Sequence, residues 1–236
     1  MIANSTLQML QGAAVSQDSS SKGIDWSKNT PTTLLTSPLF HVSGLSAGAV
    51  TSLFAGSTTL LYDGRFLANR VIELIQKYNV TSWGGAVPTA LKRVLDDAEA
   101  QGLKMMSVLV VGGGGAPMPP ELISRTKDVF PNSKHSFGYG YGLTESGAIT
   151  IINWGDNLKN EPASPGQPMP TIQVQLRDED GELIDKDSIE GEIYVKSPSV
   201  MLGYYNNTLA SKDSLTEDRW LKTGDWGFKK KSLYYI

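Results

Sequence analysis

Apolar residues recur at helical spacing in three segments of the chain, and a short predicted strand follows each segment. The helical segments are residues 68–78, 88–98 and 119–130. The predicted strands are residues 80–83, residues 108–111, which form an apolar run, and residues 134–137. This alternation predicts an α/β fold in which a mostly parallel sheet is flanked by helices with right-handed crossovers. Ligands of such sheets bind at loops that follow the carboxyl ends of the strands.

The pattern changes near Pro165, within a proline-rich run. Beyond it, apolar and polar residues alternate over 172–177, Asp180-Gly181 supplies a hairpin turn, and residues 191–196 form another predicted strand. Before the lobe, residues 2–10 predict a helix and residues 16–29 a mobile polar loop. We therefore expect three parts. They are a helix and loop over 1–33, an α/β lobe over 34–165, and a small, β-rich, distorted barrel-like subdomain over 166–236.

Composition and charge exclude several classes of function. The net charge is −3 without a basic stripe, so we expect no nucleic-acid partner. The chain has no cysteine, which excludes disulfides and thiolate chemistry, and its two histidines, His41 and His135, are too far apart to indicate a zinc site. Residues 42–62 are uncharged but rich in Ser, Thr and Gly, which predicts a buried helix and a strand rather than a transmembrane segment.

The start of the chain lacks the pattern of a secretory signal, so we expect an intracellular protein of the cytoplasm or an organelle matrix.

Four glycines, residues 112–115, follow one of the predicted strands and precede Ala116 and Pro117. Glycine lets the backbone approach a flat or anionic ligand without a Cβ clash, and it can expose several N–H groups together. The same residues also fit a flexible turn between a strand and a helix. Neither the dinucleotide-binding pattern G-x-G-x-x-G nor a P-loop matches, so this motif alone leaves both interpretations open.

A second glycine-rich segment, residues 137–147, adds an aromatic ring, a hydroxyl and a carboxylate. Gly140 and Gly142 allow a tight backbone path around Tyr141, whose ring can stack on a nucleobase. Thr144 can donate a hydrogen bond to a phosphate oxygen, and Glu145 offers a hard oxygen ligand for Mg²⁺. The alternative is a decorated turn with a core tyrosine.

Asp225 directly follows a Thr-Gly pair, which predicts a turn. A carboxylate held there can accept hydrogen bonds from both hydroxyls of a ribose. Because aspartate is common in turns, this motif gains its meaning from its place behind the two glycine-rich segments.

Five motifs follow one another along the chain. They are Pro38-Leu-Phe-His-Val-Ser-Gly44, Gly113-Gly-Gly-Ala-Pro117, Gly140-Tyr-Gly-Leu-Thr-Glu145, Gly191-Glu-Ile-Tyr-Val195 with Gly203-Tyr204, and Leu221-Lys-Thr-Gly-Asp225. In this order they resemble the adenylate-forming (AMP-binding) superfamily of acyl-CoA synthetases, 4-coumarate–CoA ligases, luciferases and peptide-synthetase adenylation domains. The resemblance runs from about residue 34 to the end of the chain, and its first motif is more similar to the CoA ligases and luciferases than to the peptide synthetases.

The resemblance implies a ligase that activates a carboxylic acid with ATP as acyl-AMP and then transfers the acyl group to CoA. It implies that Tyr141 stacks on adenine, Thr144 contacts the α-phosphate, Glu145 holds Mg²⁺ and Asp225 binds the ribose. Other residues implied to line the nucleotide and acyl sites are Gly113, Gly114, Gly115, Ala116, Pro117, Gly140 and Gly142.

The resemblance also implies an acyl pocket whose small residues leave room for a medium or long chain or an aromatic acid. Its implied members are Trp83, Ala86, Val87, Gly138 and Tyr139. His41 is implied to act near this pocket and the incoming thiol. Without the resemblance, a hydrogen-bonded core histidine is the favoured interpretation of His41.

Two parts typical of the superfamily do not occur in these 236 residues: a phosphate loop ending in Pro-Lys-Gly and a C-terminal domain with an adenylate-contacting lysine. We therefore expect a central fragment of a fatty-acid or aromatic-acid CoA ligase. By itself it is expected to be inactive or to bind nucleotide weakly, because most charge neutralisation is lost. Exposed apolar surface and strand edges would favour self-association.

Two alternatives stay open. One is a noncatalytic adenylate-binding or interaction module, and the other is an adenylation domain that loads a carrier protein.

Overall fold

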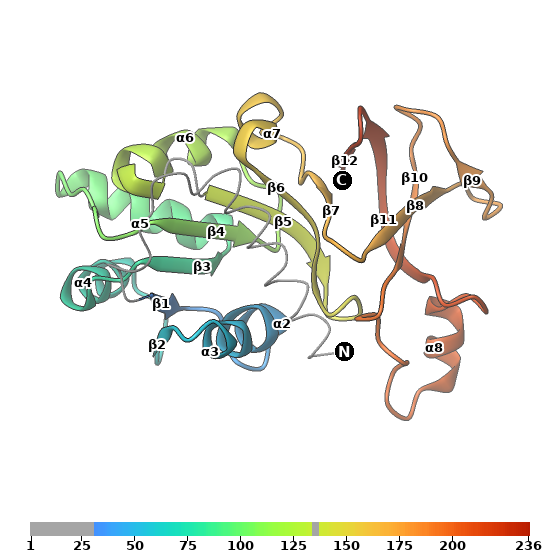
Figure 1. Cartoon of the computed structure of the whole chain (residues 1–236), viewed down its shortest axis with the longest axis horizontal. Helices are drawn as coiled ribbons and strands as arrows, with labels where there is room; N and C mark the ends of the chain where they lie inside the picture. The colour runs from blue at the N-terminus through green and yellow to red at the C-terminus, as the bar shows by residue number, and fades with distance from the viewer. Residues whose placement is uncertain (1–30, 134–136) are drawn as a thin grey trace.

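The computed structural model describes residues 31–133 and 137–236, which form two neighbouring sheets (Figure 1). The first sheet has seven strands in the order β2-β1-β3-β4-β5-β6-β7. The five strands from β2 to β5 are parallel, and β6 and β7 are antiparallel to their neighbours. The strands are β1 (Thr32–Leu35), β2 (Thr58–Leu61), β3 (Ser82–Ala86), β4 (Val110–Gly114), β5 (Phe137–Leu143), β6 (Ala148–Trp154) and β7 (Gln167–Pro168).

The predicted α/β fold with a mostly parallel sheet is therefore confirmed. The predictions for residues 2–10 and 16–29 lie outside the described residues, as does the start of the predicted strand over 134–137.

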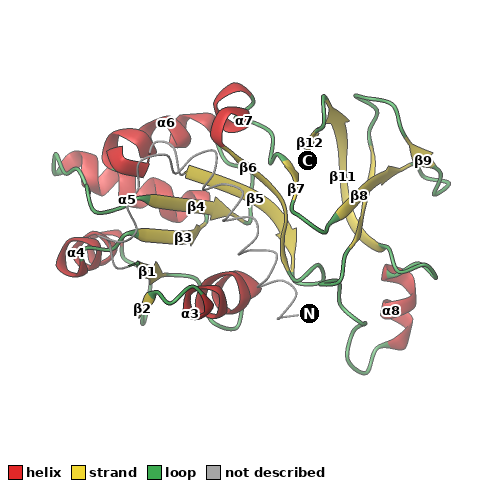
Figure 2. Ribbon diagram, in the orientation of Figure 1, coloured by secondary structure: helices red, strands yellow, loops and turns green. Residues whose placement is uncertain are grey.

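Three amphipathic helices pack beside one another on the parallel strands (Figure 2). They are α4 (Ala68–Tyr78), α5 (Pro88–Ala100) and α6 (Pro120–Val129), and they confirm the three predicted helical segments. Two of these helices begin with a proline. Proline costs no helical hydrogen bond there, because N–H groups of the first turn have no partner within the helix. Helix α4 ends where Asn79 adopts the left-handed conformation, with φ +48°.

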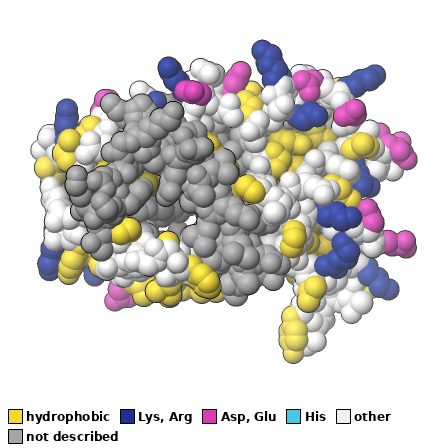
Figure 3. Space-filling view, viewed as in Figure 1, with side chains coloured by type: hydrophobic (Ala, Val, Ile, Leu, Met, Phe, Trp, Pro, Cys, Tyr) yellow, Lys and Arg dark blue, Asp and Glu magenta, His cyan; other side chains and the backbone are white. Residues whose placement is uncertain are grey.

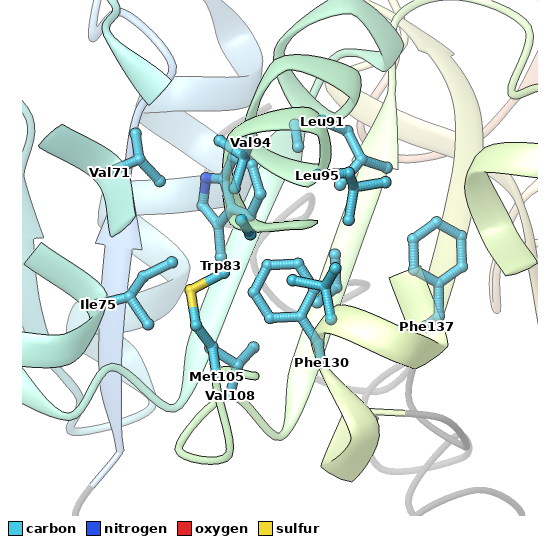
Figure 4. Close-up of a cluster of buried hydrophobic side chains, with 14 of the residues drawn as sticks. Val71, Ile75, Trp83, Leu91, Val94, Leu95, Met105, Val108, Phe130 and Phe137 are labelled. Carbon is cyan, nitrogen blue, oxygen red and sulfur yellow. The ribbon is translucent and has the colours of Figure 1, made fainter. Parts of the chain in front are cut away.

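Trp83 and Phe130 lie in the core between these helices and the sheet (Figure 4). Both side chains are fully buried, and their ring centroids are 6.1 Å apart. The Trp83 Nε1–H donates to Thr36 Oγ1 at 3.1 Å, which satisfies the one polar atom of the ring. Burial of each large apolar side chain here contributes about 1.5–3 kcal/mol. The surrounding side chains include Val71, Ile75, Leu91, Val94, Leu95, Met105 and Val108.

The second sheet has five antiparallel strands in the order β12-β11-β10-β8-β9. They are β8 (Gln173–Arg177), β9 (Leu183–Ile184), β10 (Gly191–Lys196), β11 (Leu221–Lys230) and β12 (Leu233–Tyr235). The predicted strand over 191–196 and the predicted hairpin turn are confirmed, because β8 and β9 pair across a turn in which Gly181 N donates to Asp178 O at 3.0 Å. Shorter helices are α7 (Gly155–Asn160), α8 (Thr208–Ser214) and the 3-10 turn η2 (Pro131–Ser133).

The two sheets share a second apolar core. Ile151 of β6 packs there with Ile193 and Leu221 of the second sheet, and all three are almost completely buried. Hydrogen bonds cross the same junction, where Tyr234 N donates to Gly166 O at 2.9 Å and Ser164 Oγ donates to Tyr234 O. Since β7 follows residue 165 and still pairs with β6, the division into domains near that residue stays a prediction.

The glycine-rich segments are strands, not the loops that the sequence predicted. Strand β4 extends through Gly114, and β5 includes Gly138, Gly140 and Gly142. The reason is close packing between backbones. A Cβ on Gly114 would lie 2.7 Å from Gly140 O, and a Cβ on Gly140 would lie 2.6 Å from Ile151 O. Glycine serves here to bring strands together.

The segment over 42–62 is a helix and a strand, as expected, but the helix is not buried. It consists of α2 (Val42–Gly44), the π-helical η1 (Leu45–Val50) and α3 (Thr51–Phe54), and β2 follows. Leu53 and Phe54 are 69% and 70% exposed. Figure 3 shows apolar side chains along the lower edge of the molecule, over this region. None of the helices in the described part is long and apolar enough to cross a bilayer.

Replacement of Gly140 by alanine should destabilise the fold by about 1–3 kcal/mol, because backbone oxygens cannot move away without disrupting the sheet. Gly84→Ala is the matched control, since Gly84 also lies in a strand and its Cβ would meet nothing within 4 Å. Urea unfolding followed by circular dichroism measures both changes. Equal stability of the two variants would contradict this account of β5.

Candidate functional site

Strands β4 and β5 bring the two glycine-rich motifs side by side. In the parallel register Gly113 pairs with Tyr139, and Gly114 pairs with Gly140. Gly115 then turns the chain away with φ +78°, and Ala116 and Pro117 follow on the surface. Two motifs 20 to 30 residues apart in the sequence thus form one continuous edge at the carboxyl ends of parallel strands.

Tyr141 and Asp225 join the two sheets at this edge. The Tyr141 hydroxyl donates to Asp225 Oδ2 at 2.6 Å, although the two residues are 84 positions apart in the chain. Tyr141 lies near the end of β5, and Asp225 lies in β11. Burial of the Tyr141 phenol, and then the neighbouring Asp225 carboxylate, raise the pKa of Tyr141 well above its usual range.

The backbone around Asp225 is held by side-chain hydrogen bonds. Thr223 Oγ1 donates to Ile193 O at 2.8 Å and accepts from Asp225 N at 3.1 Å. Gly224 has φ +76°, and its N–H donates to Glu192 Oε1 at 3.0 Å. Asp225 therefore does not lie in a free turn, as the sequence predicted, but at an irregularity within the long strand β11, where the register with β10 shifts.

Thr144 and Glu145 lie in the tight turn between β5 and β6. Ser146 organises this turn, since its buried Oγ accepts from Leu143 N at 3.1 Å and from Thr150 Oγ1 at 2.8 Å. Thr144 is exposed, and Glu145 is half-buried. The turn follows β5 directly, so Thr144 and Glu145 lie at the end of the sheet where Tyr141 lies.

Tyr204 contacts Glu145, a role that the sequence did not reveal. The Tyr204 hydroxyl donates to Glu145 Oε1 at 2.9 Å, and this bond raises the pKa of Tyr204. The motif Gly203-Tyr204 was visible in the sequence, but nothing in its spacing indicated a contact 59 residues upstream. Thr223 and Ser146 were missed for the same reason.

The residues around Glu145 fit a magnesium ion that a nucleotide helps to bind. Within residues 31–133 and 137–236 there is no group of three or more His, Asp or Glu side chains able to hold a metal. Mg²⁺ characteristically takes only one or two protein carboxylates and completes its shell with phosphate oxygens and water. A single half-buried carboxylate with one oxygen oriented by Tyr204 matches that requirement.

His41 is exposed and caps a helix, so it is not the core histidine favoured by the residues alone. Its Nδ1 accepts from Ser43 N at 3.1 Å and lies 2.8 Å from Ser43 Oγ. The reason is local, because a histidine at this position can accept from a free N–H of the first helical turn.

The residues expected in the acyl pocket differ in burial. Trp83, Ala86 and Tyr139 are buried, and the Tyr139 hydroxyl donates to Pro162 O at 3.0 Å. Gly138 is half-buried, and Val87 is 42% exposed. The three buried members therefore support the edge of the sheet from within, and Val87 is the member that reaches its surface.

A parallel sheet with glycines, a tyrosine and carboxylates at one carboxyl edge is typical of enzymes that bind nucleotides. The chain belongs to the AMP-binding enzyme family, whose model matches residues 4–205. Among curated relatives, 4-coumarate–CoA ligase 1 of Narcissus pseudonarcissus is 31% identical and covers 81% of this chain and 35% of that protein. A 4-coumarate–CoA ligase-like protein of Oryza sativa subsp. japonica is 33% identical and covers 86% and 36%, respectively.

Solved structures agree with this assignment. The o-succinylbenzoate CoA synthetase of Bacillus subtilis, in complex with its acyl-adenylate intermediate, is 27% identical with a TM-score of 0.79, covering 98% of this chain and 44% of that chain. The same enzyme with ATP and a magnesium ion is 29% identical with a TM-score of 0.77, covering 95% and 44%. The chain spans about a third of the length of the curated relatives that it matches.

The stability of the fold should fall as the pH rises above about 10. Burial raises the pKa of Tyr139 to about 12, and the pKa of Tyr141 is raised as well. Unfolded tyrosines lose their protons near pH 10. The folded state therefore binds more protons, and this stabilisation, complete below pH 10, is lost as the pH rises through the folded pKa values.

Urea unfolding between pH 8 and pH 11.5 measures this dependence. Tyr141→Phe should make the decline less steep, and Tyr205→Phe is the control because Tyr205 is 94% exposed. An unchanged slope in Tyr141→Phe would contradict the assignment.

Proposed function

We propose that this chain carries the adenylate-binding core of an AMP-forming ligase that activates a carboxylic acid and transfers it to CoA. The observation that carries the proposal is the hydrogen bond between Tyr141 and Asp225 beside the paired glycine strands. It brings an aromatic ring and a carboxylate from distant motifs to one place, as recognition of a nucleoside requires. The family and its relatives, which include CoA ligases by name, support the same conclusion.

In this proposal Tyr141 and Asp225 recognise the nucleoside. Asp225 Oδ2 accepts a hydrogen bond from the Tyr141 hydroxyl. This bond orients the carboxylate and leaves Oδ1 for the ribose hydroxyls. The ring of Tyr141 stacks on adenine, and the backbone of Gly113, Gly114 and Gly115 with Ala116 lines the site. The bond to Asp225 also keeps Tyr141 in one rotamer, so less conformational freedom is lost when the nucleotide binds.

Thr144 and Glu145 act on the phosphates. Thr144 is exposed at the turn and donates to the α-phosphate, while Glu145 holds Mg²⁺. When bound, the metal neutralises charge on the phosphates, which favours attack by an anionic carboxylate. The fixed turn around Ser146 keeps both side chains at the same end of the sheet.

The acid is a fatty or aromatic acid, and CoA is the acceptor thiol. The support for an aromatic acid comes from relatives named for 4-coumarate and o-succinylbenzoate. Val87 is exposed and Gly138 is half-buried beside the glycine strands, and His41 is exposed at the start of the helix that follows β1. An acyl-adenylate analogue should therefore bind more tightly than AMP.

Isothermal titration with AMP tests the nucleotide site. Asp225→Ala should weaken AMP binding by about tenfold to a hundredfold, because hydrogen bonds to a charged acceptor contribute about 1.5–3 kcal/mol. Asp128→Ala removes an exposed carboxylate from α6 and should leave the affinity unchanged. If wild type and Asp225→Ala bind AMP equally, Asp225 is not the ribose ligand.

Pyrophosphate release separates binding from catalysis. Assayed alone, the 236 residues should release pyrophosphate from ATP and 4-coumarate far more slowly than a full-length relative, because they contain no Pro-Lys-Gly phosphate loop. A rate comparable with that of the relative would show that this chain performs the first step unaided. Slow pyrophosphate release that Asp225→Ala abolishes would favour the ligase core over the adenylate-binding module.

A further inference from the structure

The short segment that follows β10, residues 197–204, holds the turn that carries Glu145. Met201 N donates to Glu145 O at 2.8 Å, and Ser199 Oγ donates to Ser146 O at 2.9 Å. The same segment ends at Tyr204, whose hydroxyl donates to the Glu145 carboxylate. Both the backbone and the side chain of Glu145 are therefore fixed by one stretch of chain.

Tyr204 is itself held by helix α8, which lies just beyond it (Figure 1). Tyr204 N donates to Ser211 Oγ at 2.8 Å, and Ser211 Oγ donates to Asn207 O at 2.7 Å. A Cβ on Gly203 would lie 2.9 Å from Ser211 Oγ, so glycine is needed where the segment approaches the helix. The phenol of Tyr204 is 39% exposed, and packing alone does not fix it. Its orientation depends on these hydrogen bonds.

Arg219 adopts an unusual backbone conformation that serves the same segment. Its φ is +70°, which lies in a backbone region that residues other than glycine and asparagine rarely adopt. Its guanidinium donates to Met201 O at 2.7 Å through Nη2 and to Leu202 O at 3.2 Å through Nη1. A disfavoured backbone conformation persists only where its surroundings enforce it. The hydrogen bonds to these two carbonyls are contacts of that kind, and their role needs an explanation.

We infer that Arg219 and Tyr204 are positioning residues that orient Glu145 for the metal, a role that rests on the proposed function of Glu145. Arg219 holds the carbonyls of Met201 and Leu202, and Met201 N holds the Glu145 backbone. Tyr204 donates to Oε1 of the carboxylate, and Oε2 would be the oxygen that holds the cation. Groups that orient a metal ligand typically change metal affinity by 10- to 100-fold when they are removed.

Calorimetric titration of the 236-residue chain with ATP, in excess Mg²⁺ and in EDTA, measures this role. The ratio of the two affinities reports what the metal adds, and AMP affinity reports the nucleoside site. Tyr204→Phe, which removes only the hydroxyl, should lower the ratio about tenfold. Arg219→Gly, which relieves the φ of +70° but removes both hydrogen bonds, should lower it similarly. AMP affinity should stay within twofold in both variants.

Two matched controls separate this effect from changes of surface or backbone. Tyr205→Phe alters the adjacent tyrosine, which is 94% exposed. Lys231→Gly removes an exposed cation at a position with φ +50°, the same change of charge and backbone as Arg219→Gly. Both controls should keep the wild-type ratio, and circular dichroism confirms that each variant is folded.

Each other result overturns the inference in a different way. An unchanged ratio in Tyr204→Phe and Arg219→Gly would show that Glu145 needs no positioning. An equal loss of AMP and Mg·ATP binding would indicate a general structural role. Wild-type protein that binds AMP but gains nothing from Mg²⁺ would remove Glu145 as a metal ligand and leave the nucleoside site intact. Absence of AMP binding would contradict the proposed function as well.

Discussion

The close approach of backbone to backbone along β5 is the constraint on which the rest of the molecule depends. Gly114 lets β4 approach the Gly140 carbonyl of β5, and Gly140 lets β5 approach the Ile151 carbonyl of β6. Because β4 and β5 are parallel neighbours, their carboxyl ends meet at one edge. Tyr141 and the turn with Glu145 then follow directly from that edge. The glycines therefore build the site by shaping the sheet, as well as by leaving room for a ligand.

The second sheet completes what the first begins. Tyr141 lies in β5 and Glu145 in the turn that follows it, whereas their partners come from beyond the first sheet: Asp225 from β11 and Tyr204 from the segment after β10. The shared apolar core around Ile151 holds the two sheets against each other, because its side chains are buried between them. Hydrogen bonds that cross the junction include the one from Ser199 Oγ to Ser146 O. Because hydrogen bonds are directional, they fix the orientation of the groups they join, which apolar contacts do not. The position of the carboxylates thus depends on both kinds of contact.

The helices could be predicted from the sequence because their apolar spacing is a local signal. Segment 68–78 is α4, and the starts of α5 and α6 differ from expectation by at most one residue. The glycine strands could not be predicted, since glycine is depleted in strands and only a neighbouring backbone explains it there. Strand β6 was missed because its pairing follows a turn built around Ser146, a tertiary arrangement. The motifs indicated Tyr141 and Asp225, but the bond between them needed the fold.

Arg219 illustrates why a motif does not contain its whole function. Its φ of +70° and its two hydrogen bonds to backbone carbonyls cannot be read from a sequence, and the residue lies two positions before the motif that begins at Leu221. The chain between residues 219 and 225 therefore contacts both halves of the candidate site. Asp225 accepts a hydrogen bond from Tyr141, while Arg219 reaches Glu145 through residues 201–204. The two contacts are held by different groups. Tyr141 and Thr223 hold Asp225, whereas Arg219 holds the carbonyls of Met201 and Leu202. Loss of the Arg219 side chain therefore acts on the turn with Glu145 and leaves the hydrogen bonds of Asp225 in place.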